Sequence, residues 1–140
     1  MNKKTIQYKK GIVFTKEQIS ELFLSDPDWS SGKYPDRLFR AVNKSDWFLS
    51  AWDGEKLVGF INCIDDGCMT CFLLYLIVDT NYKRSGIGTT LLKKMIRHYK
   101  AYNRIMLTTE TDNIAFYERL GFTRKEYDVA MYRKQWIFTE

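Results

Sequence analysis

Residues that bind metal ions or form disulfide bonds are scarce in this chain of 140 residues. It has one histidine, His98, and three cysteines, Cys63, Cys68 and Cys71. An odd number of cysteines, with no secretory signal ahead of them, predicts free thiols in a reducing compartment and hence a cytoplasmic protein. A zinc site would need a fourth ligand, and His98 lies far along the chain from the cysteines, so we expect no metal.

Long apolar runs are also absent. The longest, Cys71–Val78, has the length of a strand, whereas a helix that spans a bilayer needs roughly 20 apolar residues. The basic start, Met1–Thr5, has no apolar segment behind it. We therefore expect neither a signal peptide nor a membrane partner.

The composition is that of a folded protein, with 45% hydrophobic and 28% charged residues. The length suits a single domain over residues 1–140. A net charge of +5 allows an anionic partner. A nucleic acid, an acidic lipid and a phosphorylated cofactor fit that charge equally well.

The first part of the chain predicts a short strand over Thr5–Lys9 and then two helices. Thr15 and Gln18 form a capping-box pattern at the start of a helix that runs to Leu24. Pro35 suits the first turn of a second helix. The segment between the helices is rich in Ser, Asp, Gly and Pro, which predicts a loop.

The next part has the period of strands. Strands are predicted over Trp47–Trp52, Lys56–Asp65 and Thr70–Val78, with hairpin turns at Asp53-Gly54 and Asp66-Gly67. The third strand is almost wholly apolar, so we expect it to be buried on both faces in mid-sheet. A two-residue turn at Asp66-Gly67 would place Cys63 and Cys71 on opposite faces.

Helices and strands alternate towards the end. The predicted elements are a helix over Ile87–Tyr99, a strand over Ile105–Thr109, a helix over Asn113–Arg119, and closing strands over Arg124–Tyr127 and Met131–Phe138. A meander followed by a helical crossover predicts a mixed sheet with helices on its faces.

A loop with two glycines, Lys83-Arg84-Ser85-Gly86-Ile87-Gly88, joins the apolar strand to the helix after it. A helix N-terminus has unpaired N–H groups and a partial positive charge, so it attracts anions. Gly86 and Gly88 allow a sharp turn and leave room for a phosphate, while Lys83 and Arg84 supply cations. The alternative is a tight turn without a ligand. The spacing fits neither a Walker A loop nor a three-glycine dinucleotide fingerprint.

Four segments together resemble the GNAT superfamily of acyl-CoA-dependent N-acetyltransferases. They are Leu74–Asp79, Tyr82–Gly88, Leu91-Leu92 and Phe116–Phe122. The resemblance implies a GNAT-like α/β (α+β) fold, with a mixed, mostly antiparallel twisted sheet of about six to seven strands and helices on both faces. It also implies an enzyme that moves an acetyl group from acetyl-CoA to a primary amine of a small molecule or peptide by direct attack.

The resemblance implies cofactor contacts along the apolar strand and the glycine loop. They are Leu76, Ile77 and Val78 for the pantetheine arm, and Lys83, Arg84, Ser85, Gly86, Ile87, Gly88 and Thr89 for the diphosphate. Tyr117 matches the family's tyrosine that protonates the departing CoA thiolate, and a phenol with an ordinary pKa of about 10 is a reasonable donor to a thiolate. Asn113 is assigned a further cofactor contact, with a helix cap as the alternative.

The acceptor and the general base stay open. The loop residues Asp26, Asp28, Trp29 and Tyr34 would suit a cationic amine, or they form a solvated loop. Candidate bases are Glu110, Asp79, Asp65 or a water chain. A helix face with Lys93, Lys94, Arg97 and Lys100 favours a solvated surface over a nucleic-acid site. The alternative functions are a non-catalytic CoA-binding regulatory module and, less favoured, a basic nucleic-acid-binding domain. Dimers are common in the family, so a homodimer is one expected state.

Overall fold

The computed structural model describes residues 5–133 and 135. The chain forms two compact units, one ending at Leu107 and the other beginning at Thr108. The first unit carries a sheet with three α-helices, and the described part of the second carries one short α-helix.

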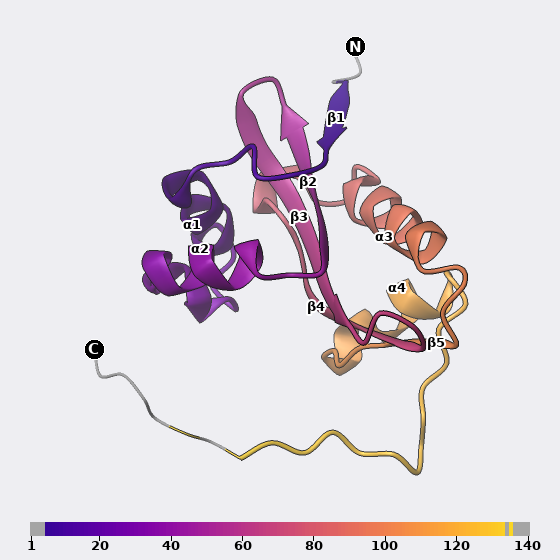
Figure 1. Ribbon diagram of the computed structural model, residues 1–140. Coiled ribbons are helices and arrows are strands. Elements are labelled where there is room, and N and C mark those ends of the chain that lie inside the picture. The colour runs from indigo at the N-terminus through magenta and orange to yellow at the C-terminus, as the bar shows by residue number, and fades with distance from the viewer. Residues whose placement is uncertain (1–4, 134, 136–140) are drawn as a thin grey trace. The chain divides into compact units, whose positions relative to one another are not determined.

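The first unit is built on a five-stranded sheet with the strand order β1-β2-β3-β4-β5 (Figure 1). The strands are β1 (Ile6–Lys9), β2 (Trp47–Asp53), β3 (Lys56–Asp65), β4 (Thr70–Val78) and β5 (Arg104–Met106). Neighbours from β1 to β4 are antiparallel, whereas β5 is parallel to β4. A parallel neighbour requires a crossover, which α3 (Ile87–His98) supplies.

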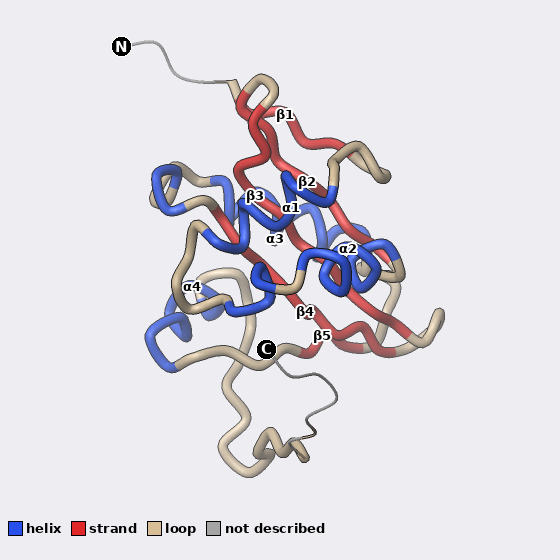
Figure 2. Tube along the Cα trace, turned by 90° about the vertical axis from the view of Figure 1, so that its left-hand side faces the viewer, coloured by secondary structure: helices blue, strands red, loops and turns tan. Residues whose placement is uncertain are grey.

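Helices cover both faces of this sheet, as predicted. The helices α1 (Lys16–Leu24) and α2 (Pro35–Asn43) lie on one face and α3 lies on the other (Figures 1 and 2). The capping box at the start of α1 is confirmed, because the Gln18 amide donates to Thr15 Oγ1 at 3.1 Å and the Thr15 amide donates to Gln18 Oε1 at 2.9 Å.

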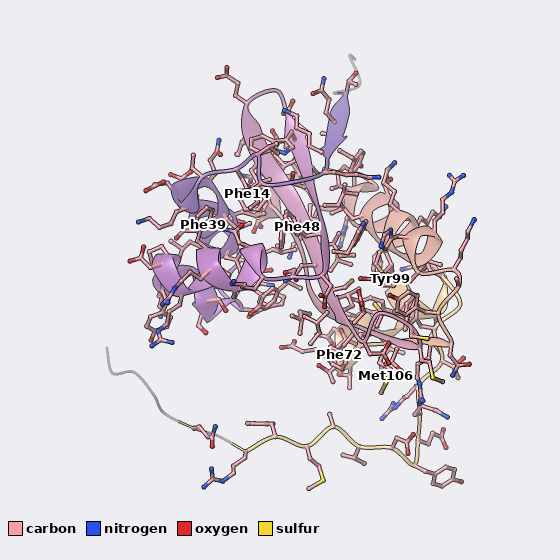
Figure 3. All side chains as sticks on the ribbon, in the orientation of Figure 1. Phe14, Phe39, Phe48, Phe72, Tyr99 and Met106 are labelled. Carbon is pink, nitrogen blue, oxygen red and sulfur yellow. The ribbon has the colours of Figure 1, made fainter. Side chains whose placement is uncertain are left out.

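Aromatic side chains fill the layer between the sheet and the first two helices. Phe14 packs edge-on against Phe39 and Phe48, with ring centroids 6.3 Å and 6.0 Å apart (Figure 3). The same layer buries Ile19 and Phe23 of α1. The apolar side chains of α1 and α2 thus belong to one continuous core cluster on this face of the sheet, with α1 packed against β3 and α2 packed against α1.

Among the described residues the sheet has five strands, fewer than the six to seven expected. Residues 124–133 form no strand, so the predicted strand over Arg124–Tyr127 is wrong. The predicted strand Met131–Phe138 falls partly outside the described residues, and its described part is not in a strand. β5 is only three residues long and ends before Thr109. A pattern of alternating apolar residues shows that a segment can form a strand, but it forms one only where a neighbouring strand is available to pair with it.

The β3–β4 hairpin differs from its prediction. Four residues, 66–69, join the strands, and the Asp66 carboxylate accepts hydrogen bonds from the amides of Cys68, Met69 and Thr70. With this longer loop and a register shift after Asn62, Cys63 opposes Leu73, so Cys63 and Cys71 lie on the same face. Their thiols are in contact yet unbonded, and this contact together with burial raises the pKa of Cys63.

The close approach of α3 to the sheet depends on one glycine. A Cβ atom at Gly59 would lie 3.0 Å from Ile87 Cγ2 and 3.2 Å from both Ala51 Cβ and Leu91 Cδ1. All three neighbours are buried, so none can move into solvent. Gly59 therefore sets how near the first turn of α3 lies to β3.

We expect Gly59→Ala to lower the free energy of unfolding by about 1–3 kcal/mol, because the added methyl group overpacks the interface between α3 and the sheet. Urea unfolding followed by circular dichroism measures the loss. Adding Ala51→Gly should recover part of it by removing one of the close contacts. An unchanged urea midpoint for Gly59→Ala would contradict this account of the interface.

Candidate functional site

The loop between β4 and α3 has two residues in the left-handed region. Gly86 has φ 88° and Arg84, which is not a glycine, has φ 64°. A left-handed φ at a non-glycine residue is uncommon and is concentrated at ligand sites. The space above Gly86 is open, because a Cβ atom built there meets nothing within 4 Å. The loop is therefore bent without being crowded, and a ligand can reach its backbone.

The N-terminus of α3 has unused hydrogen-bond donors. Gly86 is the N-cap residue, and no side chain in the described part of the chain caps this helix. The amides of Ile87, Gly88 and Thr89 belong to the first turn, where no carbonyl of the helix is available to them. The positive end of the dipole of this twelve-residue helix also lies here. Uncapped amides at the positive end of a helix are groups that can bind phosphate, and the diphosphate contact itself stays a prediction.

The neighbouring hydroxyl groups serve the loop itself. The Ser85 hydroxyl donates to the Tyr82 carbonyl, and Thr90 Oγ1 donates to the Gly86 carbonyl at 2.9 Å. Ile87 is buried to 2% exposure under the loop. Among the predicted diphosphate residues, Ser85 and Ile87 thus have side chains that serve the turn itself.

The outer edge of β4 opens beside this loop. Within the described residues, β5 pairs with β4 only at Thr70–Phe72, so the edge from Leu73 to Val78 has no partner strand. On the inner side the Asp79 amide donates to the Val58 carbonyl at 2.8 Å. Hydrogen bonding alternates along an antiparallel pair, so the backbone groups of Val78 and Leu76 point to the open edge.

Of the three β4 residues that were predicted to contact the pantetheine arm, Ile77 has a side chain that belongs to the core instead. Its side chain is buried in the core beneath α1 and α2. Leu76 and Val78 alternate with it and are half-buried on the other face. An extended polar chain could therefore pair with the backbone of β4 while these side chains stay in place.

A β-bulge that the sequence pattern did not predict lies in the middle of β4. Asn62 opposes Tyr75 and Cys63 opposes Leu73, so Leu74 is an extra residue, and it is 38% exposed. The expectation that β4 is buried on both faces is wrong here. The displaced Tyr75 amide donates a hydrogen bond to Oδ1 of the fully buried Asn62 at 2.9 Å. The sequence feature that could have indicated the bulge is Asn62, the lone asparagine in the apolar run of the neighbouring strand β3.

Lys83 is not the free cation that was expected at the mouth of the loop. Its Nζ lies 3.1 Å from Asp26 Oδ2, on the connection after α1. Burial alone would raise the pKa of Asp26, but the Asp28 amide and the Lys83 ammonium together hold it below its ordinary value. Asp26 is therefore an anion that is already paired.

Trp29, one of the two aromatic residues expected at the acceptor pocket, belongs to a packed cluster. The Trp29 ring lies 5.6 Å from that of Phe23 and 5.3 Å from that of Tyr75 on β4. Trp29 is half-buried, and Asp28 beside it is exposed. The connection after α1 is thus anchored to the sheet next to the bulge.

Two of the candidate bases have structural partners. Asp79 caps the turn after β4, accepting from the Asn81 amide at 2.8 Å, and its other oxygen lies 3.6 Å from Lys56 Nζ. Asp65 accepts from the hydroxyl groups of Tyr99 and Tyr102. These contacts explain both carboxylates without a role in proton transfer. The third candidate, Glu110, is exposed and lies in the second unit.

The second unit holds Tyr117 in α4 (Ile114–Glu118). The Phe122 amide donates to the Tyr117 carbonyl at 3.2 Å, the Gly121 amide donates to the Glu118 carbonyl at 3.1 Å, and Gly121 has φ 92°. This is a Schellman motif, in which Phe122 packs on Tyr117 with ring centroids 5.7 Å apart. Burial raises the pKa of Tyr117, so its phenol keeps its proton at neutral pH.

Asn113 stands at the N-cap position of α4, after a 3-10 turn over Thr111–Asn113. Its side chain makes no capping hydrogen bond within the described chain, so the alternative of a side-chain cap is wrong. The cofactor contact assigned to Asn113 stays a prediction.

The described residues contain no group of three or more His, Cys, Asp or Glu side chains placed to share a metal ion. None of their helices has the length and apolar character to cross a bilayer.

Comparison with known proteins adds to this geometry. The family model described as Acetyltransferase (GNAT) family matches residues 16–122. A GNAT-family acetyltransferase structure from Streptococcus pneumoniae is 30% identical, with a TM-score of 0.76, and the match covers 97% of this chain and 100% of that one.

Two curated relatives match over shorter stretches. Mycothiol acetyltransferase from Corynebacterium glutamicum is 30% identical over 74% of this chain and 39% of its own length. Human N-alpha-acetyltransferase 30 is 39% identical over 51% of this chain and 22% of its own length. The chain thus spans well under half the length of these relatives.

The pair formed by Asp26 and Lys83 predicts a pH-dependent contribution to stability. Because the folded pKa of Asp26 lies below the ordinary value of 3.8, the contribution is complete above that value and is lost as the pH falls through the folded pKa. We expect Asp26→Asn to be less stable than the wild type by about 1 kcal/mol at pH 7. Urea unfolding between pH 7 and pH 2 should show this difference shrinking only below about pH 4. A difference that is constant down to pH 2 would contradict the assignment.

Proposed function

Because the chain belongs to the GNAT acetyltransferase family, we propose that it moves an acetyl group from acetyl-CoA to a primary amine. The observation that carries this proposal is the uncapped N-terminus of α3 behind the left-handed residues Arg84 and Gly86. These features suit a diphosphate and have no other described use. The open edge of β4 beside them suits the extended arm of the same cofactor.

The chain's own residues divide the work of binding. The amides of Ile87, Gly88 and Thr89 would hold the diphosphate, and the exposed Arg84 side chain would add a cation. The backbone groups of Leu76 and Val78 would pair with the pantetheine arm, as a neighbouring strand does. When bound, acetyl-CoA supplies the activated thioester.

Amides at the open edge also suit the chemistry of acyl transfer. Backbone donors held in place beside the bulge at Leu74 would stabilise negative charge on the thioester oxygen as the neutral amine attacks. Tyr117 holds a proton at its Oη for the leaving thiolate, and its raised pKa keeps that proton in place at neutral pH. A non-catalytic CoA-binding module would need the same cradle without this donor.

The acceptor is proposed as a primary amine of a small molecule or a peptide. The names of the relatives specify mycothiol in one case and an α-amino group in the other, which spans both classes. A screen of amines from both classes, read as release of free CoA thiol, would identify the acceptor. Cytoplasmic location, a single domain over residues 1–140 and a homodimer stay predictions.

The cradle is tested by Gly86→Glu. The new carboxylate would stand where the diphosphate binds, and like charges so placed cost several kcal/mol, so we expect CoA affinity to fall by about a hundredfold or more. Isothermal titration of CoA measures the change. Gly67→Glu is a matched control, because Gly67 also has a left-handed φ, 80°, and open space around it, but it lies in the β3–β4 turn. Equal CoA affinity in the two variants would refute the assignment of the diphosphate site to this loop.

Tyr117→Phe removes the proposed proton donor and keeps the ring that packs on Phe122. We expect turnover of a good acceptor to fall by about a hundredfold, within the range for loss of a general acid, while the Kd for CoA stays within about twofold. Steady-state assays and CoA titration separate the two effects. Full activity of the variant would remove Tyr117 from this role.

A further inference from the structure

Two loops that are distant in sequence are joined next to the cradle. Thr80 Oγ1, at the end of β4, donates to the Ser25 carbonyl at 2.5 Å. Three residues later, Lys83 Nζ lies 3.1 Å from Asp26 Oδ2. The connection that follows α1 is therefore held at two adjacent points against the segment that begins the cradle.

The two partners of the ion pair differ in exposure. The Asp26 side chain is 12% exposed and is also fixed by the Asp28 amide, which donates to Oδ1 at 3.0 Å. The Lys83 side chain is 51% exposed. An ammonium group has three N–H donors, and Asp26 takes one of them. Asp26 is thus the fixed member, and the lysine keeps donors that can reach a second acceptor.

We propose that Asp26 is a positioning residue for the cofactor, which holds the Lys83 ammonium at the mouth of the cradle so that lysine is shared between this carboxylate and the diphosphate. The inference rests on the proposed function, since it requires CoA in the cradle. It gives the connection after α1 a part in cofactor binding, although none of its residues belongs to the glycine loop. A lysine tethered in this way loses less conformational entropy when it meets a phosphate than a free lysine does.

The sign of the effect separates positioning from simple charge. Asp26 is an anion near an anion site, so neutralising it should strengthen CoA binding if only Coulomb repulsion matters. If Asp26 positions Lys83, neutralising it should weaken CoA binding. Asp28 provides the matched control, because it lies two residues away, is exposed, and changes the net charge by the same amount when it is replaced by asparagine.

The test is titration of the full chain with CoA at moderate salt, for the wild type, Asp26→Asn, Asp28→Asn, Lys83→Met and the double variant of Asp26 and Lys83. We expect Asp26→Asn to bind CoA about three- to fivefold more weakly than the wild type, the range of one partly exposed ion pair. Asp28→Asn should bind as well as the wild type or slightly better. The double variant should bind no more weakly than Lys83→Met alone, because Asp26 acts through the lysine.

Other outcomes overturn the inference in recognisable ways. Equal affinity of Asp26→Asn and Asp28→Asn, in a protein whose wild type binds CoA, refutes positioning and leaves the proposed function intact. Losses that add in the double variant refute it as well, since they would show that Asp26 acts independently of Lys83. A wild type that does not bind CoA overturns both proposals.

A folding defect is kept apart from positioning by a conservative variant. Asp26→Glu retains the carboxylate, so it should recover most of the affinity lost in Asp26→Asn, with circular dichroism confirming that both variants fold. In a protein that carries Lys83→Arg, adding Asp26→Asn should again weaken CoA binding. In a protein that carries Lys83→Met, adding Asp26→Asn should not weaken it further. Failure of Asp26→Glu to recover any affinity, while folded, counts against the proposal.

Discussion

The close contact between the first turn of α3 and β3 at Gly59 is the constraint on which the candidate site depends. Ile87 lies directly over this glycine, and it is also the first residue of the helix. The contact that buries Ile87 therefore fixes where the free amides of α3 stand. Hydrophobic packing beneath the helix thus sets the position of the polar N-terminus of α3 at the candidate site.

Several local features around this contact are unfavourable when each is taken alone. Arg84 has a left-handed φ, the start of α3 has no side-chain cap within the described chain, and the edge of β4 beyond Phe72 has no partner strand there. Folded proteins usually avoid each of these. Their occurrence within a short distance along the chain is what a binding site for a large, anionic, extended cofactor would require.

The ion pair of Lys83 and Asp26 shows how the two halves of the first unit are connected. α1 and its following connection belong to the layer on one face of the sheet, while the cradle leads into the helix on the other face. The pair and the neighbouring bond of Thr80 to Ser25 join them at the end of β4. The bulge at Leu74, supported by Asn62, lies in the same strand and beside the cluster of Trp29 and Tyr75.

Much of the fold was predictable because it depends on local patterns. The capping box of Thr15, the proline at the start of α2 and the glycine that ends α4 act over a few residues, so the sequence alone shows them. The glycine loop was found for the same reason, since a strand, a turn and a helix in succession place amides at one point. The resemblance carried by the segments around Gly86 and Tyr117 then led to the family.

What sequence alone determined about this protein is therefore most of the elements as far as α4, the glycine loop between β4 and α3, and the family. Only the tertiary structure decided that Lys83 is paired with Asp26, that Cys63 and Cys71 share a face, and that β4 is bulged at Leu74. Each of these depends on register or on residues distant along the chain. A shift of one residue in register reverses every side chain that follows it, and no local pattern records which distant partner a charged side chain will meet.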